Sequence, residues 1–211
     1  MEGKFLSFEG GEGCGKSTII KIVYDALAKE KREILITREP GGTNISDQIR
    51  GVILDKKNTE MDGITEAYLY AASRRQHMFE KVIPALESNK IVISDRFLDS
   101  SIVYQGYVRG YGMENIMKIN EYAIKDKNNK IVLPDLTIYF DLDPRIGLER
   151  IAKNSDREVN RLDLEKIDFH EKVREGYLKW AKQNPERIKI IDASGISIFV
   201  IQFWTLNFNI S

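Results

Sequence analysis

The sequence is poor in the features of secreted and membrane proteins. Its single cysteine, Cys14, excludes an internal disulfide and any zinc site built from several cysteines. The apolar stretch near the N-terminus, residues 5–8, is too short for a signal peptide. No uninterrupted apolar run reaches the roughly 20 residues that a membrane helix needs. We therefore expect a cytoplasmic protein that makes no membrane contact.

The chain also lacks an excess of either charge. Lysine and arginine together number 32, and so do aspartate and glutamate. Proteins that bind nucleic acid usually carry a basic surplus, so no nucleic-acid partner is expected, and any polyanion must be bound at a local site. A length of 211 residues suits one domain with a sizeable core, which we take to span residues 1–211.

Short apolar runs alternate with stretches of helical periodicity. The runs are rich in β-branched and aromatic residues and short enough to be strands buried on both faces. Alternation of this kind predicts an α/β fold with a five-stranded parallel sheet and helices on both faces. The predicted strands are residues 5–8, 34–37, 91–94, 136–140 and 188–191, and the predicted helices are residues 18–29, 66–86, 113–124 and 163–181.

The segment FEGGEGCGKST, residues 8–18, follows the first predicted strand and contains the phosphate-binding pattern GxxxxGKS. Its glycines let backbone N–H groups turn inward, and the following helix adds its positive end. Lys16 is expected to reach the β- and γ-phosphates, and the Ser17 hydroxyl is expected to ligate Mg²⁺. The expected nucleoside triphosphate site comprises Gly10, Gly11, Glu12, Gly13, Cys14, Gly15, Lys16, Ser17 and Thr18. Hydrolysis, regulation and phosphoryl transfer all remain possible.

Two further strand ends carry charged residues. The turn TREPGGT, residues 37–43, is stiffened by Pro40 and brings Glu39 and the later Arg50 toward the carboxyl edge of the sheet. After the third strand, Asp95 offers a carboxylate for Mg²⁺ and Arg96 a guanidinium for an anion. The alternative for this last pair is an ordinary surface ion pair, which would stabilise the protein little.

Tyr70 and Arg74 are four residues apart on a predicted helix and therefore share a face. An aromatic ring and a guanidinium on one face can stack on a base and hydrogen-bond its edge. The alternative is that the ring packs in the core and the arginine lies at its rim. For His77 and His170 we expect only surface or packing roles.

Taken together, the motifs resemble those of thymidylate kinases of the bacterial type, a family with the P-loop kinase fold that phosphorylates dTMP with ATP. The resemblance covers residues 4 to about 192. It rests on FEGxEGxGKST, TREPGGT, AASRRQH (71–77), DRFxDSSxxYQG (95–106), PDLTIYFDL (134–142) and DREVNRLD (156–163), in that order.

The resemblance implies a role for each matching residue. Tyr70 would stack on thymine, Arg74 and Gln105 would bind the edge of the base, and Tyr104 would occupy the space of a ribose 2′-hydroxyl. The full dTMP site implied by the family is Glu12, Glu39, Pro40, Arg50, Tyr70, Arg74, Arg96, Ser101, Tyr104 and Gln105.

Glu12 is the one carboxylate inside the phosphate loop. In the family the matching residue turns away from the triphosphate and accepts a hydrogen bond from the 3′-hydroxyl of the acceptor. A charge argument agrees, because two negative unit charges 4 Å apart repel by about 4 kcal/mol at an effective dielectric constant of about 20. The alternative is a solvated glutamate at the tip of the loop.

Phosphoryl transfer needs cations around the migrating group, and the loop itself supplies only Lys16. The family closes a mobile, arginine-bearing lid over ATP, and residues 150–163 match it. Arg150 and Arg161 are the matching lid arginines. The implied catalytic residues are Lys16, Asp95, Arg96, Arg150 and Arg161, with Ser17 and Asp95 holding Mg²⁺.

Two alternatives remain at this point: another nucleoside monophosphate kinase, and a non-enzymatic P-loop switch that binds GTP. No NKxD motif for guanine is present, which speaks against the switch. The family also implies a homodimer formed through helices that flank the sheet. The chain departs from the family at its end, because residues 193–211 carry no charge where an amphipathic helix is usual.

Overall fold

The computed structural model describes residues 3–29, 32–153 and 165–195. A parallel sheet of five strands lies at its centre, in the order β2-β3-β1-β4-β5. The predicted fold class is therefore confirmed, with each strand within about two residues of its expected position. The strands are β1 (Lys4–Gly10), β2 (Ile34–Arg38), β3 (Ile91–Asp95), β4 (Leu136–Asp141) and β5 (Ile188–Asp192).

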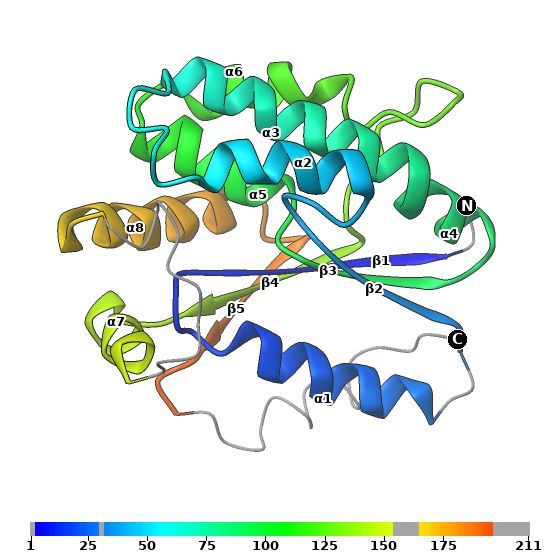
Figure 1. Ribbon diagram of the computed structural model, residues 1–211. Helices are drawn as coiled ribbons and strands as arrows, with labels where there is room; N and C mark the ends of the chain where they lie inside the picture. The colour runs from blue at the N-terminus through cyan, green and yellow to red at the C-terminus, as the bar shows by residue number, and fades with distance from the viewer. Residues whose placement is uncertain (1–2, 30–31, 154–164, 196–211) are drawn as a thin grey trace.

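The helices cover both faces of this sheet, as Figure 1 shows. On one face α1 (Lys16–Ala28) packs its apolar side against alternate residues of the central strands, including Leu6, Phe8 and Ile93. The opposite face is covered by α3 (Gly63–His77), α4 (Ile83–Glu87), α5 (Leu98–Ser101), α6 (Met113–Glu121) and α8 (Ile167–Gln183). Strand residues of the other parity, such as Phe5 and Val92, fill that second core.

The periodicity did not predict α2 (Asn44–Leu54), which packs on α3, the short helix α5, the π-helical segment η2 (Ile102–Val108) or α7 (Pro144–Ala152). A second π-helical segment, η1 (Met78–Val82), lies within a predicted helix. The single helix expected over residues 66–86 is divided into α3, η1 and α4, and Pro84 lies in the first turn of α4. Lacking a backbone N–H, this proline is compatible with a helix start but not with an unbroken helical interior.

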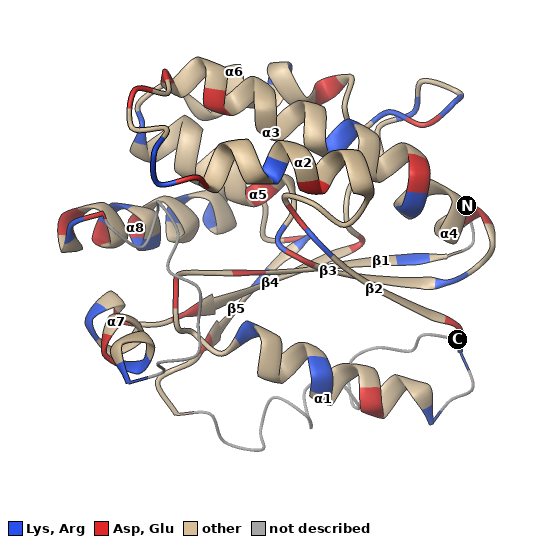
Figure 2. Cartoon of the chain, in the orientation of Figure 1, with Lys and Arg blue, Asp and Glu red and all other residues tan. Residues whose placement is uncertain are grey.

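Opposite charges are intermixed along the helices. In Figure 2 the surface of α8 alternates between basic and acidic side chains, in keeping with the balanced composition. In the described part of the chain, no helix has the length and apolar character that crossing a bilayer requires.

Register along the sheet brings the functional strand ends together. Phe8 of β1 lies opposite Asp95 of β3 on one side and Ile138 of β4 on the other, so the phosphate loop leaves the sheet between those two neighbours. In parallel sheets, ligands bind beyond the carboxyl ends of such central strands.

Candidate active site

One cavity of about 480 Å³ lies at that edge of the sheet. It brings together most of the residues predicted from the sequence. Gly10 and Gly11 do not line it, and Arg161 falls outside the described residues. The predicted residues around the cavity are Glu12, Gly13, Cys14, Gly15, Lys16, Ser17, Thr18, Glu39, Pro40, Arg50, Tyr70, Arg74, Asp95, Arg96, Ser101, Tyr104, Gln105 and Arg150.

The phosphate loop forms one end of the cavity. Gly15 has φ of 90°, which a residue with a side chain rarely adopts, and α1 begins directly after it. The first N–H groups of α1 therefore point into the loop. Lys16 is 9% exposed, and its ammonium group donates to the Gly10 carbonyl oxygen at 3.4 Å. The loop is thus shaped for an anion.

Helix α7 lies with its backbone directly against this loop. Gly13 has φ of 71°, and a Cβ atom built there would lie 2.2 Å from the carbonyl oxygen of Gly147. A Cβ atom at Gly147 would lie 2.2 Å from the carbonyl oxygen of Glu12. One turn further along α7, the Arg150 guanidinium donates to the Gly13 carbonyl oxygen at 3.4 Å. The first predicted lid arginine therefore lies against the phosphate loop.

Glu12 turns toward Arg96. Its Oε1 accepts a hydrogen bond of 2.7 Å from Nη2 of Arg96. This contact holds the carboxylate against the guanidinium, and its orientation relative to the donor phosphates stays a prediction. The contact also corrects the idea of an ion pair between Asp95 and Arg96, because the guanidinium pairs with Glu12 instead.

Arg96 has an unusual backbone, with φ of 70°, a region that costs free energy for a residue with a side chain. Its N–H donates to the Phe8 carbonyl oxygen at 3.0 Å, which fixes this conformation against β1. Burial alone would lower the pKa of its guanidinium, but the adjacent Tyr104 and Glu12 raise that pKa above its ordinary value. Arg96 is therefore a fixed cation at neutral pH.

Beneath Arg96 lies a buried carboxylate that the sequence analysis did not single out. Glu9 of β1 accepts hydrogen bonds from the Ser100 hydroxyl at 2.6 Å and the Tyr177 hydroxyl at 2.7 Å. Both hydroxyls also contact Nη1 of Arg96, at 3.3 and 3.5 Å. Burial, and then the negative charge of Asp99, raise the pKa of Glu9 to about 7. An acidic residue directly after the mainly apolar run of residues 5–8 was the available signal.

Arg50 faces other cations across the cavity. Its Nη1 donates to the Pro40 carbonyl oxygen at 2.9 Å, which directs the guanidinium toward the cavity. Burial, and then the positive charge of Arg38, lower the pKa of Arg50, and Arg96 adds to this repulsion. Guanidinium groups held together in this way form a site for a doubly charged anion such as a phosphate monoester.

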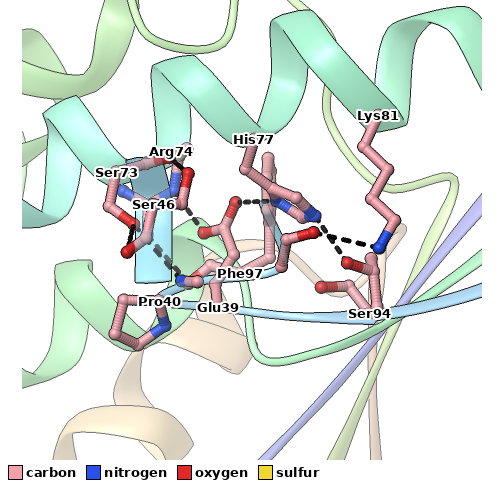
Figure 3. Close-up of polar contacts among 12 residues, drawn as sticks. Glu39, Pro40, Ser46, Ser73, Arg74, His77, Lys81, Ser94 and Phe97 are labelled. Atoms are coloured by element: carbon pink, nitrogen blue, oxygen red, sulfur yellow. Dashed lines mark hydrogen bonds and ion pairs between the residues drawn. The ribbon is translucent and has the colours of Figure 1, made fainter. Parts of the chain in front are cut away.

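Arg74 belongs to a buried network at the other end of the cavity, shown in Figure 3. Its Nε donates to Oε2 of Glu39 at 2.8 Å, and its Nη2 donates to the Ser101 hydroxyl at 3.1 Å and the Phe97 carbonyl oxygen at 3.3 Å. Nη1 donates to the side-chain oxygen of Asn120. The guanidinium is 2% exposed, so these bonds compensate for burying its charge.

His77 extends the network behind Glu39 and is fully buried, so a surface role for it is wrong. Its Nδ1 lies 2.9 Å from Oε1 of Glu39, and its Nε2 lies 2.6 Å from the Thr37 hydroxyl. The two ring nitrogens of His77 therefore join Glu39 to Thr37. His77 lies three residues after Arg74 on the same helix, so the sequence could have placed both side chains on one face.

Several polar atoms in the site lack a hydrogen-bond partner in the described part of the chain. They include Oδ1 of Asp95, the hydroxyl of Tyr104 and Oε1 of Gln105, all of which are buried. Buried polar groups usually have partners, so unpaired ones around a cavity are the groups that a ligand would satisfy.

Similarity to known proteins agrees with this geometry. A family model described as thymidylate kinase matches residues 8–198. Thymidylate kinases of Geobacillus sp. (strain WCH70) and Clostridium novyi (strain NT) are each 56% identical to this chain over 92% of its length, and the matches cover 90% and 92% of those proteins.

The fold has a counterpart among solved structures. The crystal structure of thymidylate kinase from Ehrlichia chaffeensis matches with a TM-score of 0.75 and 30% identity, covering 97% of this chain and 99% of that one. These matches favour a thymidylate kinase over both alternatives left open by the sequence, another nucleoside monophosphate kinase and a non-enzymatic P-loop switch. The phosphate loop, the arginines for a second anion and the adjoining buried pocket agree with these matches. Together the family model and the relatives show that the protein belongs to the thymidylate kinase family.

Proposed function

We propose that this protein transfers the γ-phosphoryl group of ATP to dTMP, giving ADP and dTDP. The observation that carries the proposal is that one cavity joins the phosphate loop to a buried polar pocket, with the cations of Arg50 and Arg96 between them. That arrangement suits two nucleotides lying end to end with their phosphates meeting at the centre.

On the donor side, the backbone of the loop and the N-terminus of α1 would hold the triphosphate of ATP, and Lys16 would contact its terminal phosphates. On the acceptor side, Arg50 and Arg96 would bind the phosphate of dTMP, and Glu12 would accept from the 3′-hydroxyl. Fixed cations of this kind stabilise the charge that develops on the migrating group.

The base would lie in the pocket formed by Tyr70, Arg74 and Gln105, with Ser101 supporting Arg74. Tyr104 lies beside Arg96, whose guanidinium is 5.5 Å from the centre of its ring. Its buried ring would leave no room for a 2′-hydroxyl and so would favour deoxyribose. Glu39 and Pro40 would form the near wall of this pocket.

The residues present fit a magnesium ion. Oδ1 of Asp95 is buried without a partner, and Ser17 lines the same cavity. Nowhere in residues 3–29, 32–153 and 165–195 do three or more His, Cys, Asp or Glu residues gather closely enough to hold a metal, so the ion would depend on phosphate oxygens as further ligands. When bound, Mg²⁺ would neutralise negative charge on the β- and γ-phosphates.

Arg150 and Arg161 would supply the cations that the phosphate loop lacks, as parts of a lid at about residues 150–163. The contact between Arg150 and the Gly13 carbonyl oxygen supports the first of these roles. Arg161 lies outside the described residues, and its role rests on the family resemblance alone. We expect the lid to belong to a single kinase domain spanning residues 1–211.

We further propose that the protein is a cytoplasmic homodimer. Three exposed aromatic residues support an interface on the outer surface of α3, η1 and the end of α6: Tyr68, Phe79 and Tyr122 are 60%, 64% and 78% exposed. Tyr68 and Tyr122 both border a shallow hollow on that surface. Sedimentation of the wild type and of a Tyr68→Glu variant would test the proposal, with a shift to monomer expected in the variant.

The experiment that tests the activity is a coupled assay of ADP formation with Mg-ATP and each of dTMP, dUMP, UMP, CMP, AMP and GMP. We expect ADP to form with dTMP far faster than with any ribonucleotide. ADP formation without an added acceptor would instead indicate an ATPase, and a preference for another monophosphate would indicate a different kinase.

A further inference from the structure

Behind the proposed base pocket, Gln105 is bonded to a buried carboxylate, Glu66, that has no assigned role. Gln105 of η2 and Glu66 of α3 are each 1% exposed. Nε2 of Gln105 donates to Oε1 of Glu66 at 2.6 Å. The two residues are 39 positions apart, and nothing in the motif pattern of the chain connects them.

This bond fixes which end of the Gln105 amide faces the pocket. An ionised carboxylate has no proton to donate, so it selects the NH₂ end of the amide. The carbonyl end, Oε1, is then held away from Glu66. Oε1 is buried and without a partner among the residues that the structure describes, while Gln105 itself lines the cavity. Glu66 thus leaves one unsatisfied acceptor facing the site of the base.

Arg74 supplies the complementary group. A guanidinium has five N–H donors, and four hydrogen bonds from Arg74 go to Glu39, Asn120, Phe97 and Ser101. One N–H group of Nη1 is left for a ligand. The pocket therefore offers an acceptor from Gln105 and a donor from Arg74.

We propose that Glu66 is a positioning residue that determines base specificity by locking the Gln105 amide with its oxygen toward the substrate. The inference rests on the proposed location of the base beside Gln105. A base with an N–H between two carbonyl groups, as in thymine or uracil, meets this pattern. Cytosine presents an acceptor at that nitrogen and an amine beside it, so it leaves buried groups unpaired, which strongly disfavours binding. The pair does not distinguish thymine from uracil.

The substitution Glu66→Gln tests this role with almost no change in shape. An amide at position 66 can either donate or accept, so the Gln105 amide can be satisfied in both orientations. We expect the ratio of kcat/KM for dCMP to that for dTMP to rise by about tenfold or more, while kcat for dTMP changes less than about threefold. Arg74 still opposes the amine of cytosine, so some preference for dTMP remains.

The double substitution Glu66→Gln with Gln105→Glu is the matched rescue. It reverses the direction of the hydrogen bond and again leaves only an acceptor facing the base. We expect rejection of dCMP to return to within about threefold of the wild type. A general packing defect would not be repaired by a second substitution in the same buried pair. Thermal melting of each variant shows whether it is folded.

Gln105→Ala separates failure of this inference from failure of the proposed base site. An unchanged KM for dTMP in Gln105→Ala would show that the base binds elsewhere. A raised KM in Gln105→Ala, together with an unchanged preference between dCMP and dTMP in Glu66→Gln, would overturn the role of Glu66 alone. A shifted preference that the double substitution does not restore would also contradict it.

Discussion

The two halves of the cavity are built in opposite ways. The donor half is a contiguous loop whose functional groups are mostly backbone N–H groups and one lysine. The acceptor half is assembled from side chains of α3, α5, η2 and the turn after β2, which bond to one another and to Asn120 of α6 behind them. We infer that the acceptor half is also part of the core of the protein. Substitutions on the donor side should therefore lower activity with little effect on stability. Substitutions on the acceptor side should lower both.

The sharpest test of this contrast is Arg74→Leu. Removing the guanidinium leaves the buried carboxylate of Glu39 without its main partner, and such a change usually costs about 3–5 kcal/mol of unfolding free energy. Urea denaturation followed by circular dichroism would measure it. The matched control is Lys127→Ala, which breaks the exposed pair with Glu87 and should cost less than about 0.5 kcal/mol. Similar small losses in both variants would remove the distinction.

Lys16→Met should show the opposite behaviour. The substitution keeps most of the aliphatic stem and removes the charge that is proposed to contact the donor phosphates. We expect turnover to fall by about two to three orders of magnitude, equivalent to about 3–4 kcal/mol of barrier. The free energy of unfolding should stay within about 1 kcal/mol of the wild type. A large loss of stability would show that the loop, too, is part of the core.

Glu9 lies beneath the junction of the two halves and predicts a dependence of stability on pH. Its pKa of about 7 in the folded protein lies above the ordinary value of 4.5, so the folded state holds this proton more tightly than the unfolded chain. The stabilisation is complete below about pH 4.5 and is lost as the pH rises through about 7, by at most about 3 kcal/mol.

The substitution Glu9→Gln isolates this contribution, because the variant carries a neutral group at every pH. Unfolding free energies of the two proteins, measured between about pH 5 and pH 8, should differ in slope, with the wild type losing stability relative to the variant as pH rises. Parallel curves would mean that the carboxylate is already ionised at pH 5.

The smallest effect is expected at His77, which contacts Glu39 rather than the cavity. His77→Phe keeps a ring but leaves the Glu39 carboxylate and the Thr37 hydroxyl without this partner, a cost of about 1–3 kcal/mol in stability. We also expect KM for dTMP to rise severalfold while KM for ATP is unchanged. His77→Asn retains a donor toward Glu39 and should recover most of the KM effect. An equal rise in both KM values would indicate a general distortion instead.

Much of the fold followed from local patterns. The central strands β1, β3 and β4 are apolar runs buried on both faces, as expected, and the phosphate loop consists of consecutive residues. The edge strands β2 and β5 are not buried on both faces, because each has a neighbouring strand on one side only. Helix α7 was missed because its start depends on Asp143, whose side chain accepts from the N–H of Arg145, and on Pro144 directly after it, rather than on a long apolar stripe. Hydrophobic periodicity predicts a short helix of this kind poorly.

The second layer of the site could not be predicted for a different reason. Glu9 bonds to Tyr177 across 168 positions, and Arg187 to Asp99 across 88. A sequence shows that a carboxylate lies in an apolar segment but not which distant residue meets it. The roles of Glu66, Asn120 and Ser100 emerge only from the fold.

The paired glycines Gly13 and Gly147 fix the distance between the phosphate loop and α7. Because the two main chains touch without side chains between them, the height of α7 above the donor phosphates is set by peptide dimensions, which hardly vary. The same contact fixes the position of Arg150, which lies one turn away on that helix. Even one methyl group added at either glycine would push α7 away from the loop. Arg150 would then move away from the proposed place of phosphoryl transfer.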